Sequence, residues 1–139
     1  MTIYFCGSIA GGRGYLDTYT KMVRYLQSLG HVVPTEHIIA PNVLEIEKKE
    51  TAEQIYQRDV EWLSESNKVI AEISNPSLGV GYEIGYALNL GKSVLALYKK
   101  GLFVSCMITG NTDANLSVME YSSQEEWREH IDRFIKSET

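Results

Sequence analysis

Two carboxylic acids stand out as groups that could carry out a reaction. Asp59 falls between Ile55 and Leu63 at the spacing of one helical face, which places a carboxylate on the inward-facing side of a predicted amphipathic helix. Glu83 follows a predicted strand-to-helix turn in which glycines keep side chains away. Paired carboxylates in different environments suit glycosidic cleavage, because one can attack or stabilise the anomeric carbon while the other moves protons.

Each acid also has a purely structural explanation. An unpaired buried carboxylate costs several kcal/mol, so Asp59 could instead be satisfied by Arg58, by Arg13 or by backbone amides. Glu83 could be an ordinary structural glutamate, but its place beside a turn cleared by glycines favours a functional role. A third polar group, Tyr4, lies near the end of the first predicted strand.

The turn before Glu83 has the features of an anion site. Residues 75–86 read NPSLGVGYEIGY and connect an apolar, β-branched run to a helical pattern. Ser77 is placed to cap that helix, whose free N–H groups favour an anion, while Gly79 and Gly81 let a ligand approach the backbone. The turn therefore indicates a site for a phosphorylated small molecule, although a tight turn without a ligand explains glycines alone about as often.

Strand and helix patterns alternate along the chain and predict one α/β domain over residues 1–139. Right-handed crossovers then give a doubly wound five-stranded parallel sheet in a three-layer α/β/α arrangement, flavodoxin-like or Rossmann-like, with strand order 2-1-3-4-5. Residues 34–50 are predicted to form a long loop over one face. The predicted strands span residues 2–6, 31–33, 68–73, 93–98 and 116–120, and the predicted helices span residues 15–29, 52–66, 78–90, 102–108 and 123–136.

This topology places two glycine-rich loops side by side. In the predicted order, the chain reverses direction between the first and third strands, and ligands bind beyond the carboxyl ends of strands at such a point. The loops that leave those ends are residues 7–14 and 74–79. Both loops are therefore expected to border one crevice, with Asp59 and Glu83 on the helices that flank the third strand.

Composition and motifs exclude several classes of function. The net charge of −5, without a stripe of lysine and arginine, argues against binding to a nucleic-acid polymer, and no apolar run approaches the length of a membrane span. The glycines do not match a dinucleotide fingerprint, and neither a P-loop nor a serine-hydrolase elbow is present. Cys6 lies in a predicted buried strand, where a cysteine is usually part of the core. The two cysteines have no metal-ligand spacing, which argues against structural zinc. Because the first strand begins at once, we expect a cytoplasmic protein.

Five ordered blocks extend over nearly the whole chain and resemble the 2'-deoxynucleoside 5'-phosphate N-hydrolases of the nucleoside 2-deoxyribosyltransferase superfamily. The blocks are YFCGSIxGGR at 4–13, TEH at 35–37, DxEWL at 59–63, PSLGVGYE at 76–83 and SxMIxG at 105–110. The resemblance implies hydrolysis of the N-glycosidic bond of deoxynucleoside monophosphates to 2-deoxyribose 5-phosphate and free base, without a metal or cofactor. One departure concerns Ala10, where members of the family commonly have arginine.

The resemblance also implies roles for individual residues. Glu83 would be the nucleophile that forms a glycosyl-enzyme ester, Tyr4 would orient it, and Asp59 would bind the sugar hydroxyl and assist proton transfer. Members of the family are homodimers, in which the serine that matches Ser105 reaches the phosphate bound by the partner subunit. The remaining substrate-binding residues implied in this way are Gly7, Ser8, Ile9, Gly11, Gly12, Arg13, His37, Ser77 and Gly79.

Three alternatives remain open at this point. A nucleoside 2-deoxyribosyltransferase would admit a second base in place of water, and a CMP-type ribonucleotide N-glycosidase would act on ribonucleotides. A non-catalytic nucleotide-binding module would bind a nucleotide without releasing a base. The presence of both carboxylates argues against the module.

Overall fold

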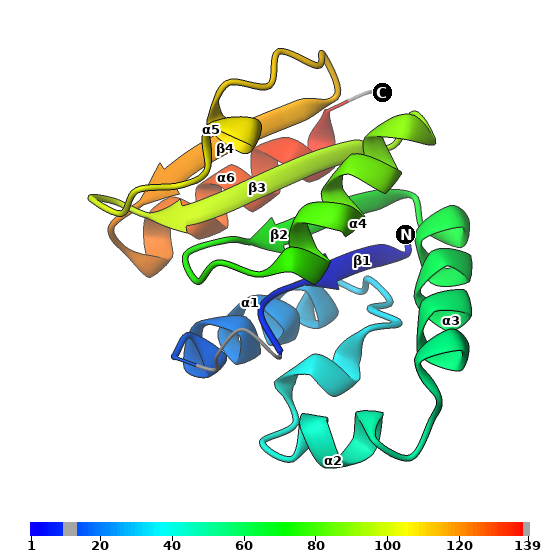
Figure 1. The fold of residues 1–139 in the computed structure, drawn as a ribbon. Coiled ribbons are helices and arrows are strands. Elements are labelled where there is room, and N and C mark those ends of the chain that lie inside the picture. Colours follow the sequence, from blue (N-terminus) through cyan, green and yellow to red (C-terminus); the bar gives the residue numbers. More distant parts are fainter. Residues whose placement is uncertain (10–13, 138–139) are drawn as a thin grey trace.

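The computed structural model describes residues 1–9 and 14–137 (Figure 1). A parallel sheet of four strands in the order β1-β2-β3-β4 forms its centre. The predicted parallel, three-layer α/β class is confirmed, and Ala10, Gly11, Gly12 and Arg13 lie outside the described residues. The strands are β1 (Ile3–Cys6), β2 (Lys68–Glu72), β3 (Ser93–Lys99) and β4 (Leu116–Tyr121).

Two pairs of helices cover the two faces of the sheet. On one face, α1 (Leu16–Ser28) and α6 (Gln124–Lys136) bury an apolar cluster that includes Phe5, Leu26 and Ile131. On the other face, α3 (Ala52–Glu65) and α4 (Leu78–Asn89) pack on a second cluster around Val69 and Ile84. Strands β1 and β2 and most of β3 are buried between the two layers, as parallel strands covered on both faces are.

The prediction of five strands was wrong. Residues 31–33 form only an isolated bridge between Thr2 and Val32, and Val32 is 62% exposed. Beyond this bridge, the Thr35 hydroxyl donates to the Phe5 carbonyl (2.6 Å) and accepts from the Phe5 N–H (3.1 Å). The Thr35 side chain therefore satisfies the backbone N–H and carbonyl of Phe5, which a fifth strand would otherwise have paired with. Pro34 has no N–H and could not have donated a hydrogen bond to β1.

The segment predicted as a long loop also contains regular structure. A 3-10 helix η1 (Glu36–Ile39) and a short helix α2 (Val43–Glu47) follow Thr35, with Ile38 and Val43 buried. The helix predicted over residues 102–108 is reduced to α5 (Cys106–Thr109), which Ser105 caps. Within the described residues, no helix is both long and apolar enough to cross a membrane.

Local capping signals fix where the helices that carry the acids begin. Thr51 and Gln54 form a capping box at the start of α3, with both reciprocal hydrogen bonds present. The Ser77 hydroxyl accepts from the Val80 N–H (3.3 Å) at the start of α4. These caps set the registers that place Asp59 two turns into α3 and Glu83 in the second turn of α4.

We predict that Thr35→Val destabilises the protein by about 1–3 kcal/mol, because the nearly isosteric change leaves the Phe5 N–H and carbonyl without a partner in a buried position. Unfolding by urea, followed by circular dichroism, measures the change in the free energy of unfolding. Thr112→Val at an exposed loop position is the control and is expected to have little effect. Equal stability of the two variants would show that the Thr35 hydroxyl does not hold this edge.

Candidate active site

A small pocket of about 30 Å³ at the carboxyl end of β1 brings together residues that are far apart in the sequence. Asp59 reaches it from α3 and Glu83 from α4, so the two predicted acids share one pocket. His37 reaches it from η1, and the chain after β1 closes it. The full lining is Tyr4, Phe5, Cys6, Gly7, Ile9, Thr35, His37, Ile38, Asp59 and Glu83.

The Glu83 carboxylate is held by a buried phenol. Tyr4, which is 1% exposed, donates a hydrogen bond from its hydroxyl to Glu83 Oε2. Burial raises the pKa of Tyr4 far above its ordinary value, so the phenol stays protonated and can only donate to the carboxylate. The hydrogen bond leaves Glu83 Oε1 as the oxygen that this phenol does not hold.

Burial also raises the pKa of Glu83, from an ordinary value of 4.5 to about 7. The nearby carboxylates of Asp59 and Glu47 raise this pKa further, whereas the hydrogen bond from Tyr4 and the charge of Arg58 lower it. A carboxyl group that titrates near neutral pH in a pocket is typical of a functional site. At neutral pH, both of its protonation states are populated.

Asp59 is paired with its neighbour in the sequence. Arg58 donates to Asp59 Oδ1 from Nη2 (2.9 Å) and from Nε (3.1 Å), and the Asp59 side chain is 27% exposed. Burial raises the pKa of Asp59, while the Arg58 guanidinium opposes that change. Asp59 therefore has the structural ion pair with Arg58 and also borders the pocket, while its role in a reaction stays a prediction.

Position 7 has to be glycine because the Tyr19 ring lies close to its Cα atom. A Cβ atom there would lie 2.8 Å from Cζ of Tyr19, whose ring is fully buried. The Tyr19 hydroxyl accepts from the backbone N–H of Ser8 (3.0 Å), and the Ser8 side chain is itself buried. Gly7 and Ile9 line the pocket, whereas Ser8 does not; the predicted residues Gly11, Gly12 and Arg13 lie outside the described part of the chain.

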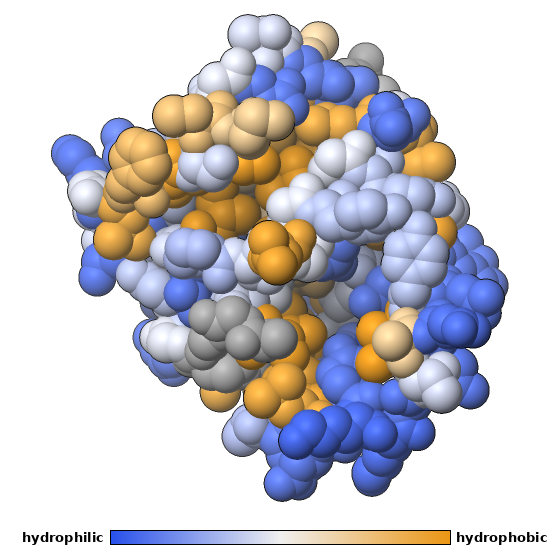
Figure 2. Space-filling view, viewed as in Figure 1, coloured by the Kyte–Doolittle hydropathy of each residue, from blue (hydrophilic) through white to orange (hydrophobic). Residues whose placement is uncertain are grey.

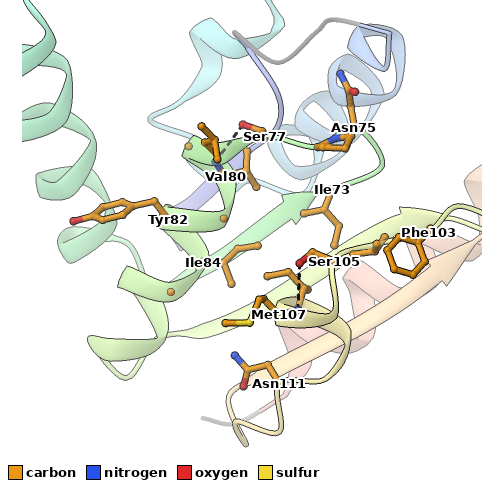
Figure 3. Close-up of a pocket in the computed structure, with 17 residues that line it drawn as sticks. Ile73, Asn75, Ser77, Val80, Tyr82, Ile84, Phe103, Ser105, Met107 and Asn111 are labelled. Carbon is orange, nitrogen blue, oxygen red and sulfur yellow. Dashed lines mark hydrogen bonds between the residues drawn. The ribbon is translucent and has the colours of Figure 1, made fainter.

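A second, larger cavity of about 800 Å³ lies on the side of α4 that faces α5 (Figure 3). Ser77 and Gly79 line it from the start of α4, and Ser105 lines it from the start of α5. The structure therefore divides the predicted site between two cavities. The acids line the small pocket, and the serines expected to bind phosphate line the large one.

This larger cavity is mostly apolar, which the sequence did not indicate. Leu78 is 97% exposed, Phe103 86% and Met107 81% at its border. Figure 2 shows this face as a hollow lined with apolar surface between α5 and α4. Exposed apolar side chains that gather around a hollow are typical of surfaces covered by a ligand or a partner. The apolar run at 102–104 was the available signal, but it was interpreted as part of a helix.

In chemical terms, the small pocket combines a nucleophile candidate with a proton carrier. Glu83 offers a carboxylate oxygen, Tyr4 stabilises the charged form, and Asp59 supplies a second carboxyl group in a more polar setting. Neither acid belongs to a cluster that could hold a metal, since the described residues contain no group of three or more metal-ligating side chains. Two acids at unequal pKa can share attack and proton transfer at one carbon.

Comparisons with known proteins agree with this chemistry. A family model described as nucleoside 2-deoxyribosyltransferase matches residues 3–122. The 5-hydroxymethyl-dUMP N-hydrolase of Esox lucius is 42% identical over 133 residues, which cover 90% of this chain and 90% of that protein. The protein of the same name from Danio rerio is 41% identical over 129 residues and covers 90% of each chain. The CMP N-glycosidase of Clostridium botulinum has a similar fold, with a TM-score of 0.67 at 19% identity over 95% of this chain and 99% of that one.

The raised pKa of Glu83 predicts a specific loss of stability as the pH rises. Below pH 4.5 the group is protonated in both the folded and the unfolded protein, so its favourable contribution is fully present there. The contribution is lost as the pH rises through about 7, and it is on the order of 3 kcal/mol.

The free energy of unfolding of the wild type should therefore fall between pH 5 and pH 8 by more than that of Glu83→Gln. Urea unfolding across this range measures both curves. Glu65→Gln, an exposed glutamate on α3, is the control and should follow the wild type. Parallel curves for the wild type and Glu83→Gln would contradict the raised pKa.

Proposed function

The chain belongs to the nucleoside 2-deoxyribosyltransferase family, and we propose that it hydrolyses the N-glycosidic bond of 2'-deoxynucleoside 5'-monophosphates to free base and 2-deoxyribose 5-phosphate. The observation that carries this proposal is the pocket in which Asp59 and Glu83 meet, with the Tyr4 hydroxyl bound to Glu83. Relatives more than 40% identical over most of the chain are named as hydrolases of a deoxynucleotide, which supports this substrate class.

In the proposed reaction, Glu83 attacks the anomeric carbon of the deoxyribose. The bond between that carbon and the base nitrogen breaks, its electron pair stays with the base, and the base takes up a proton with the help of Asp59. Water then attacks the glycosyl ester, Asp59 assists removal of its proton, and the Glu83 carboxylate leaves. The Tyr4 hydroxyl keeps one Glu83 oxygen in place throughout and favours the ionised form that must attack.

The phosphate group would be bound by neutral donors. Ser77 and the backbone amide of Gly79 stand at the N-terminus of α4, where the helix dipole favours an anion. Within the chain, the Ser77 hydroxyl accepts from Val80, so its proton remains available to donate to a phosphate oxygen. A nucleotide held there would extend along the first turns of α4 toward Glu83.

The apolar cavity fits a second copy of this chain as the partner. Its exposed Leu78, Phe103 and Met107 would be buried in a dimer, and Ser105 at its border would reach the phosphate site of the partner subunit. Each active site would then contain the acids of one subunit and a serine of the other. The dimer would thus account for why Ser105 lines a different cavity from the acids.

We predict that the wild type releases free base from at least one 2'-deoxynucleoside 5'-monophosphate and that Glu83→Ala slows release by about 10³-fold or more, because the nucleophile is lost. Chromatography of the four deoxynucleotides and the matching ribonucleotides, incubated with each protein, measures the products. Glu65→Ala is the control for removing a glutamate.

Several outcomes would reject parts of the proposal. Undiminished release by Glu83→Ala would reject the nucleophile. Turnover of ribonucleotides alone would favour a CMP-type ribonucleotide N-glycosidase, and transfer of the sugar to an added second base would favour a deoxyribosyltransferase. Tight nucleotide binding by the wild type without release would indicate a binding module.

We also predict that Ser77→Ala and Ser105→Ala each raise KM for a deoxynucleoside monophosphate about tenfold or more, while KM for the nucleoside without phosphate changes little. Loss of a hydrogen bond to a charged phosphate has a cost of this size. Because both serines are helix caps, Ser123→Ala at the start of α6 is the matched control for a lost cap. Equal effects on nucleotide and nucleoside would argue against contact with phosphate.

Mixing subunits tests whether Ser105 acts across a dimer. A heterodimer of Ser105→Ala and Glu83→Ala subunits would hold one intact site and one site with both defects. At low substrate concentration the mixture should regain up to about a quarter of wild-type activity, since half of the randomly paired dimers are mixed. Absence of recovery, with subunit exchange shown by labelled chains, would place both residues in the same subunit's site.

A further inference from the structure

Arg58 lies at the centre of a charged cluster that links the acid Asp59 to the segment from η1 to α2. Besides its two hydrogen bonds to Asp59 Oδ1, Arg58 Nη2 lies 3.3 Å from Glu47 Oε2, and Nη1 lies 3.5 Å from Glu50 Oε1. His37 Nε2 lies 3.4 Å from Arg58 Nη2 and 3.5 Å from Glu47 Oε1. One guanidinium thus contacts groups from η1, α2, α3 and the turn between α2 and α3.

We propose that Arg58 is a positioning residue for the reaction of this family: it fixes the Asp59 carboxylate at the pocket and fastens residues 36–50 against α3. The inference rests on the proposed hydrolysis, because Asp59 has its role there. It adds a residue that makes no contact with substrate and that acts through Asp59 and His37.

The geometry requires an explanation beyond a surface ion pair. Neighbouring residues on a helix point about 100° apart, so Arg58 and Asp59 would not ordinarily face each other. The guanidinium lies 4.8 Å from the centre of the Trp62 ring, one turn along α3, and this stacking holds the fork where both Nε and Nη2 reach Asp59 Oδ1. The Arg58 side chain is 19% exposed and Glu47 13%, so solvent screens these pairs less than pairs on an open surface.

The charges around the pocket explain why a cation is needed there. Asp59 on α3 and Glu83 on α4 interact with the Arg58 charge, as do Glu47 on α2 and Glu50 in the turn after α2. His37 faces Arg58 from η1, and Tyr4 and Cys6 face the acids from β1. Burial raises the pKa of both Asp59 and Glu83, repulsion from Glu47 raises both further, and the Arg58 charge lowers both. Without Arg58, Asp59, Glu47 and Glu50 would lose the guanidinium that pairs with all three, and His37 would remain beside Glu47.

Lysine could not replace this arrangement in full. An ammonium group would keep the positive charge, but it lacks the planar fork that binds Asp59 with two donors while lying over the Trp62 ring. The charge and the geometry of Arg58 can therefore be separated by two variants. Arg58→Gln removes both, and Arg58→Lys removes the fork alone.

The decisive experiment measures kcat, KM and the pH dependence of base release for Arg58→Gln and Arg58→Lys. Arg58→Gln should lower kcat/KM by about 10- to 100-fold, because Asp59 is no longer held in place. It should also move the acidic limb of the pH–rate profile to higher pH by about one unit, because both acids lose a stabilising charge. Arg58→Lys should keep the acidic limb near its wild-type position, while its kcat should be lower than that of the wild type.

Arg24→Gln is the matched control. Arg24 also holds η1, through an exposed ion pair with Glu36 (2.9 Å), but Asp59 is not among its partners. It should leave kcat/KM and the pH profile within about twofold of the wild type. An independent readout is the pKa of Asp59 from carboxyl-carbon NMR, which should rise in Arg58→Gln and stay unchanged in Arg24→Gln.

The outcomes separate this inference from the proposed function. If the wild type releases base and Arg58→Gln keeps the wild-type kcat/KM and acidic limb, Arg58 does not position the acid. A loss of stability without a change in either quantity would reduce it to a structural ion pair and equally overturn the inference. If Arg58→Gln does not fold, kcat of Arg58→Lys decides the question: a value below the wild type supports the inference, and a wild-type value overturns it. A wild type without base release rejects the proposed hydrolysis, whereas a normal Asp59 pKa in Arg58→Gln rejects the Arg58 inference.

Discussion

The contact between the Tyr4 hydroxyl and the Glu83 carboxylate is the interaction on which the site depends. It joins the edge strand β1 to α4, which packs on β2 and β3, so it requires the sheet order that places β1 beside β2. A carboxylate in this position loses much of its hydration, and one phenolic donor offsets part of that loss. Because Tyr4 is packed among core side chains, it cannot move away, and Glu83 keeps one orientation.

Much of this arrangement could be predicted from the sequence, because it follows from local signals and topology. The caps at Thr51 and Ser77 are short-range patterns, and the structure has both. The expected meeting of Asp59 and Glu83 followed from the helices that flank one strand at a reversal of strand order, and the two acids do share a pocket. In each of these cases, neighbours in the sequence or the order of elements determine the outcome.

The features that the sequence did not reveal depend on contacts between distant residues. Thr35 replaces a fifth strand through hydrogen bonds to Phe5, and no local pattern distinguishes that from a short strand at 31–33. The helical turns after Thr35 depend on burial of Ile38 and Val43 against the rest of the fold, which overrides the polar composition of the segment. The folding of Arg58 back onto Asp59 requires Trp62 as a platform, and helical periodicity alone gives no indication of it.

Neutral phosphate ligands are consistent with the electrostatics of the two acids. Ser77 and Glu83 are six residues apart, about 9 Å along α4, so a phosphate bound at the helix start would repel the Glu83 carboxylate by about 2 kcal/mol per charge at an effective dielectric constant of 20. That repulsion would raise the pKa of Glu83 further and disfavour the ionised form that must attack. In the proposed complex, amide and hydroxyl donors at the start of α4 would offset the charge of the phosphate, while Arg58 lowers the pKa of both carboxyl groups. A cation placed directly against Glu83 would also lower its pKa, but it would weaken the carboxylate as a nucleophile. If the proposed reaction holds, positive potential divided between the start of α4 and an arginine bound to Asp59 would keep Glu83 ionisable near neutral pH and still reactive as a nucleophile.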